Sequence, residues 1–91
     1  MSVPTSAPTR QQILDEIVSQ TRAAGHEKSV CPSEVARALV QDGEWRLLLG
    51  EVRRAALVLQ AAGDLEILRK GKPVPAAEVR GVIRLRRPRP S

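Results

Sequence analysis

The chain has 91 residues and a net charge of +5, and Trp45 is its only aromatic residue. A chain of this length forms one domain with a small core, and without further aromatics it lacks the stacking platform on which most proteins bind single-stranded nucleic acid. One cysteine and one histidine exclude an internal disulfide and a self-contained zinc site, and no apolar run approaches the roughly twenty residues that span a membrane.

The first nine residues, which begin MSVPTSAP, are rich in Pro, Ser and Thr, and we expect them to form a disordered tail. They lack the basic start and the apolar stretch of a signal peptide, so we expect a cytoplasmic protein. Thr9 is placed to cap a helix from Arg10 to about Ala24, and Gly25 is placed to end it. The apolar residues of this helix recur with the spacing of one buried face, at Ile13, Leu14, Ile17 and Val18.

The sequence SVCPSEVARAL predicts a second helix that begins at Pro32. Proline suits the first helical position, where its missing N–H is no loss, and Glu34 in the first turn interacts favourably with the helix dipole. We expect one short strand at Ser29–Val30, in the connector before this helix. The buried face of the helix is expected to hold Val35, Ala36, Leu39 and Val40.

The next segment, EWRLLLGEVRRAALVLQAAG, is expected to form a short helix from Glu44 to Leu49 and a longer one from Glu51 to Ala62. Glycine inside a helix costs roughly 1 kcal/mol relative to alanine, so the break is predicted at Gly50. Gly63 is expected to end the longer helix. Its inner face is defined by the spacing of Val52, Ala56 and Leu59. The residues expected to face away from the core are Arg53, Arg54, Leu57 and Ala61.

Two alternating segments in the C-terminal third predict strands. DLEILRK places Leu65 and Ile67 on one face, and VIRLRR places Ile83 and Leu85 on one face. Between them, KGKP predicts a turn and PVPAAEVRG a loop with one helical turn at Ala76–Val79. Three main helices followed by a β-hairpin wing predict an α+β, mostly α-helical, winged helix-turn-helix domain over residues 10–87, and residues 88–91 would form a basic tail.

Five stretches of the sequence carry a resemblance to a known family: SVCPSEVARAL, EWRLLLGEVRRAA, LQAAGDLEI, KGKPV and RGVIRLR. Over residues 10–87 the chain resembles the bacterial domain-of-unknown-function family 3253, which is regarded as winged-helix-like. Gly50 and Val82 stand where the family pattern has proline. The resemblance implies the fold and no activity, and it carries over no catalytic or binding residue.

The positive charge is concentrated at the C-terminal end of the chain. Residues 69–91 hold eight Lys or Arg and one Glu, a net charge of +7, whereas residues 1–68 have a net charge of −2. This asymmetry predicts an anionic partner, and arginine suits bidentate contact with phosphate or guanine. We therefore expect the domain to bind double-stranded DNA, and a transcriptional regulator is one role that fits.

The predicted DNA contacts fall into two groups. Arg53 and Arg54 begin the recognition helix, where side chains meet base edges in the major groove, and Arg46 would contact phosphate beside it. The alternative is a solvated charged face with local ion pairs, such as Glu51 with Arg54. The wing and tail would hold the phosphate backbone through Arg69, Lys70, Lys72, Arg84, Arg86 and Arg87.

Cys31 stands at the capping position of the second helix, where Ser or Thr would be usual. A thiol at a helix N-terminus can be reactive, and His26 is a candidate base for it. There is no second cysteine to resolve an oxidised thiol and no glycine-rich oxyanion site, so a packing role is favoured and a thiol sensor is the alternative. We expect no enzymatic activity and no cofactor.

Trp45 is expected to anchor the core together with Leu48 and Val52. Leu47 and Leu57 fall outside that helical face and suit self-association. The alternative to DNA binding is therefore a protein-interaction module of the same fold, in which the helix 51–62 meets a protein partner or a second copy of the chain.

Overall fold

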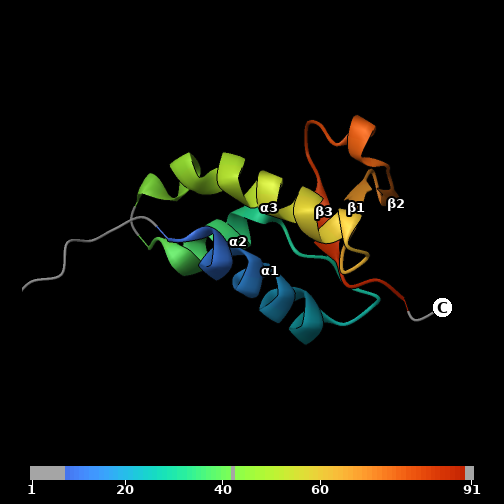
Figure 1. Ribbon diagram of the computed structural model, residues 1–91, viewed down its shortest axis with the longest axis horizontal. Coiled ribbons are helices and arrows are strands. Elements are labelled where there is room, and N and C mark those ends of the chain that lie inside the picture. Colours follow the sequence, from blue (N-terminus) through green and yellow to red (C-terminus); the bar gives the residue numbers. More distant parts are fainter. Residues whose placement is uncertain (1–7, 42, 90–91) are drawn as a thin grey trace, which may run out of the picture.

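The computed structural model describes residues 8–41 and 43–89 (Figure 1). Three α-helices come first, α1 (Arg10–Ala24), α2 (Pro32–Leu39) and α3 (Leu49–Ala61), with a 3₁₀ helix, η1 (Gly43–Leu48), leading into α3. The sheet and a second 3₁₀ helix follow as β1 (Glu66–Arg69), β2 (Lys72–Pro73), η2 (Ala76–Glu78) and β3 (Arg84–Arg86). Figure 1 shows α3 lying over α1 and α2, with the sheet at one end of the helices. The predicted α+β, mostly helical fold with a hairpin wing is confirmed.

Both predicted tails lie largely outside the described residues, which include only 8 and 9 of the N-terminal tail and 88 and 89 of the C-terminal one. Among the described residues, no helix combines the length and the apolarity that a membrane crossing requires.

Thr9 caps the start of α1, as predicted, and it forms a capping box with Gln12. The Thr9 hydroxyl accepts a hydrogen bond from the Gln12 backbone N–H at 3.1 Å, and the Gln12 side chain accepts one from the Thr9 N–H at 2.8 Å. These two bonds satisfy amide groups that have no partner inside the helix. Gly25 follows the last residue of α1 with a φ of +82°, a conformation that glycine adopts without strain.

The sheet has the strand order β2-β1-β3, and both strand pairs are antiparallel. The two-residue turn between β1 and β2 consists of Lys70 and Gly71, whose φ values of +54° and +80° are those of a type I′ turn. A bridge between Val30 and Leu85 adds the connector before α2 to the other edge, through two backbone hydrogen bonds of 2.7 Å. The short strand predicted at Ser29–Val30 is therefore present as this single bridge.

The predicted break at Gly50 is wrong, because α3 already begins at Leu49. Leu48 keeps a right-handed helical backbone, with φ −86° and ψ −12°, so η1 runs directly into α3. Gly50 lies in the first turn of α3, where backbone N–H groups have no partner within the helix and a glycine costs little. Gly63 follows the helix with a φ of +83°, as expected for a residue that ends it.

The core lies where the three helices meet the inner face of the sheet. Each of α1, α2, α3, β1 and β3 contributes at least one side chain with no exposed surface, and the largest in each are Ile17, Val35, Val52, Ile67 and Leu85. All five lie on faces that the sequence pattern predicts to be buried. Trp45 is only partly buried and packs at the edge of this core.

We predict that Gly63→Ala lowers the free energy of unfolding by about 1 kcal/mol, because an L-residue is strained at positive φ. Gly43→Ala is the matched control, since an added Cβ has open space at both positions and only Gly63 has a positive φ. Urea unfolding of both variants measures the difference. A loss of stability at Gly43 as large as that at Gly63 would contradict this account.

Candidate nucleic-acid interface

The wing consists of β1, β2 and β3 with the segments between them. Two side chains of α3, two helical turns apart, bind it. The Arg53 guanidinium donates a hydrogen bond to the Gly81 carbonyl at 3.0 Å, and the Gln60 side-chain amide donates one to the Val74 carbonyl at 2.8 Å. Leu57, between them on the same face of the helix, is half-buried against the core. The sequence predicted Arg53 and Leu57 to face away from the core, but Arg53 is bound to the segment 74–81 and Leu57 packs against the core.

Three exposed cations of the wing lie at its tip or next to the Arg53 contact. Lys70 and Lys72 are exposed at the β1–β2 turn, and Arg69 beside them is half-buried. Arg80 is also exposed, and it directly precedes Gly81, whose carbonyl accepts the bond from Arg53. The sequence did not single out Arg80, because the only feature that marked this residue was its place in a basic segment. Arg80 lies near α3 because of a contact between residues 28 positions apart, which no local pattern predicts.

Two of the predicted wing contacts have internal partners instead. The Arg84 guanidinium donates to the Ser29 hydroxyl at 2.5 Å and to the Ser29 carbonyl at 2.9 Å, which fastens β3 to the connector before α2. Arg86 forms an ion pair with Glu66 on the neighbouring strand, at 2.8 Å, and its side chain is only 17% exposed. Each of these two arginines uses two guanidinium nitrogens to hold the sheet and its neighbours together, and Arg84 stays exposed.

The predicted helix contacts also have partners within the chain. The Arg54 guanidinium lies 2.5 Å from the Glu51 carboxylate in an exposed i, i+3 pair, which contributes only a few tenths of a kcal/mol. The guanidinium carbons of Arg37 and Arg46 lie 4.4 Å and 4.7 Å from the centre of the Trp45 ring, within the range of cation–π attraction. Trp45 therefore positions two cations in addition to packing at the edge of the core.

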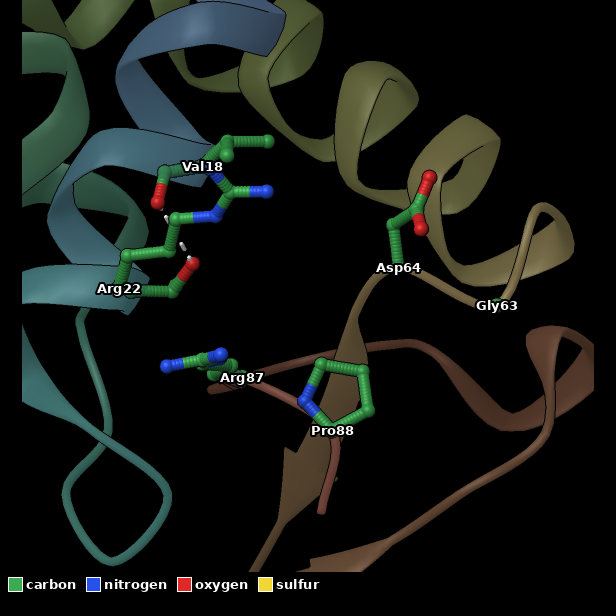
Figure 2. Close-up of a pocket in the computed structure, with 7 residues that line it drawn as sticks. Val18, Arg22, Gly63, Asp64, Arg87 and Pro88 are labelled. Carbon is green, nitrogen blue, oxygen red and sulfur yellow. Dashed lines mark hydrogen bonds between the residues drawn. The ribbon is translucent and has the colours of Figure 1, made fainter. Parts of the chain in front are cut away.

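A hollow of about 320 Å³ lies away from the wing tip (Figure 2). It is formed by the last half of α1, the turn between α3 and β1, and the segment after β3. Figure 2 shows Arg22 and Arg87 on one side and Asp64 on the other. Because Glu66 pairs with Arg86, Arg87 lies at the end of the sheet opposite the Lys70–Gly71 turn. The structure thus separates Arg87 from the other predicted wing contacts.

Cys31 lies at the N-cap of α2 in a shallow apolar groove between α2, α3 and the wing. Its sulfur accepts a hydrogen bond from the Ser33 hydroxyl at 3.0 Å, and its backbone N–H donates to the Glu34 carboxylate at 2.7 Å. The thiol is half-buried, with neighbours such as Leu49 and Ile83. The packing role that the sequence favours for Cys31, and the alternative of a thiol sensor, both stay predictions.

Within residues 8–41 and 43–89, no three His, Cys, Asp or Glu side chains are grouped so that they could hold a metal ion. The Nδ1 atom of His26 is buried and has no hydrogen-bond partner.

We predict that Cys31→Ser leaves the protein at least as stable as the wild type, because a hydroxyl is a preferred N-cap acceptor. Cys31→Ala removes the acceptor and should lower the free energy of unfolding by about 1 kcal/mol relative to Cys31→Ser. Chemical denaturation of both variants measures this difference. Equal stability of the two would show that a hydroxyl at position 31 does not cap α2.

A search of curated proteins returned no match. The model of a family described as "Protein of unknown function (DUF3253)" matches residues 10–88, which include all the helices and strands described above. The chain therefore belongs to the DUF3253 family.

Proposed function

We propose that the protein binds double-stranded DNA and that its basic wing makes the main contacts, to the phosphate backbone. The observation that carries the proposal is the hydrogen bond from Arg53 to the Gly81 carbonyl. Together with the bond from Gln60 to Val74, it fixes both ends of the segment 74–81 on α3. A wing that is already ordered loses less conformational entropy when it binds, which favours affinity.

The charge of the wing supports an anionic partner. Residues 69–77 hold Arg69, Lys70 and Lys72 and no acidic residue, and Arg80 follows beside α3. Lys70, Lys72 and Arg80 are exposed, so they are free to approach phosphate without first losing a buried contact. Contacts of this kind supply affinity that falls steeply with salt and carries little sequence information.

Base reading by α3 receives less support. Arg53 is bound to the wing, and Arg54 is paired with Glu51, whose carboxylate would lie near DNA phosphates if α3 entered the major groove. The proposal therefore gives the wing the leading role, and the reading of bases by Arg53 and Arg54 stays a prediction. A role as a transcriptional regulator depends on that reading.

We predict that Lys70→Asn weakens duplex binding and makes it less dependent on salt. The change removes a cation while keeping a residue that tolerates a φ of +54°, so the turn should persist. Loss of one phosphate contact lowers the slope of log K against log salt concentration by about 0.9. Fluorescence anisotropy with a labelled duplex measures this slope.

Arg10→Gln is the control for Lys70→Asn, because it removes one exposed cation at the start of α1, outside the wing. It should leave the salt dependence nearly unchanged. The proposal fails if the wild type shows no duplex binding at low salt, or if the two variants change the slope equally.

Selection of preferred sequences from a random duplex pool tests the reading of bases by α3. If the wing makes the main contacts, the wild type and Arg54→Gln should both enrich no strong motif. A motif that the wild type enriches and Arg54→Gln does not would instead establish base reading by α3.

A further inference from the structure

One face of α3 has no partner in the described structure. The core covers the face of Val52, Ala56 and Leu59, and the wing covers the face of Arg53 and Gln60. We call the remaining face, with the end of η1 that continues it, the α3 strip. Its residues are all exposed and are Leu47, Gly50, Glu51, Arg54, Val58 and Ala61.

The α3 strip is apolar at both ends and charged in the middle. Leu47 is 82% exposed and Val58 is 39% exposed, which makes them two of the three exposed large hydrophobic residues in the described chain. The Glu51–Arg54 ion pair lies between them. The Arg54 guanidinium lies over Gly50, 3.7 Å from the position that a Cβ would take there.

Four of these residues would meet a complementary partner in a second strip that runs antiparallel to the first. Leu47 and Val58 lie at equal distances along the chain from the point between Val52 and Arg53, and so do Glu51 and Arg54. If a second α3 strip packs antiparallel about a two-fold axis at that point, Leu47 meets Val58 of the second copy. Glu51 then meets Arg54 of the second copy, and symmetry repeats both contacts.

We propose that the α3 strip is the interface of a homodimer, with a second copy of this chain as its occupant. The strip holds one acidic and one basic residue, so it has no net charge that would attract DNA. In two antiparallel strips, each of these residues lies opposite a residue of the other charge. The strip is little more than one helix long, so the interface is small and the dimer forms reversibly. Such a dimer would bury Arg54, so dimer formation and base reading by α3 are alternatives. The wing would stay exposed in the dimer.

Sedimentation velocity over a series of protein concentrations tests the dimer. The wild type should shift from monomer toward dimer as concentration rises, and Leu47→Glu should remain monomeric at the same concentrations. Val82→Glu is the matched control, because Val82 is 86% exposed but lies outside the α3 strip. Both side chains are so exposed that their replacement should not affect folding, which circular dichroism checks.

Two charge variants test the pairing itself. Arg54→Glu alone and Glu51→Arg alone each place like charges opposite one another across the two-fold axis, so each variant should be monomeric. An equal mixture of the two should form a heterodimer, since opposite charges then meet at both positions, and no contact within a single chain can produce this result. The proposal is overturned if the wild type stays monomeric, if Val82→Glu weakens association as much as Leu47→Glu, or if the mixture does not associate.

Discussion

The three faces of α3 determine how the rest of the molecule is arranged. One face is buried in the core through Val52 and its neighbours, and a second is covered by the wing through Arg53 and Gln60. Only the third face is exposed. The apolar pattern of α3 predicts one covered face, but the structure covers two. Fewer side chains of α3 are therefore left for recognition. The surface available for binding is therefore divided between the exposed α3 face and the basic wing.

The helices, the strands and the core could be predicted because local pattern determines them. The capping residue Thr9, the proline at the start of α2 and the alternation of Leu65 and Ile67 act over a few neighbouring positions. The start of α3 was misplaced for a local reason as well, because a glycine in the first turn of a helix costs less than one in its interior. The 3₁₀ helix before it does not stand out in the hydrophobic spacing.

The candidate site was predicted less well, because the roles of its arginines depend on contacts between distant parts of the chain. Arg84 binds Ser29, 55 positions earlier, and Arg86 binds Glu66, 20 positions earlier. No local pattern separates these two from Lys70, which projects at the wing tip. A count of positive charges predicted a basic wing correctly, but it could not show which cations are used to hold the fold together.

The bridge between Val30 and Leu85 also bears on how the chain folds as it is made. Leu85 is fully buried and completes the core between the sheet and the helices, yet it lies 55 positions after its bridge partner Val30. During synthesis the three helices leave the ribosome before the strand that closes the core over them. Their apolar faces stay incompletely covered until β3 emerges, so stable folding must wait for that strand.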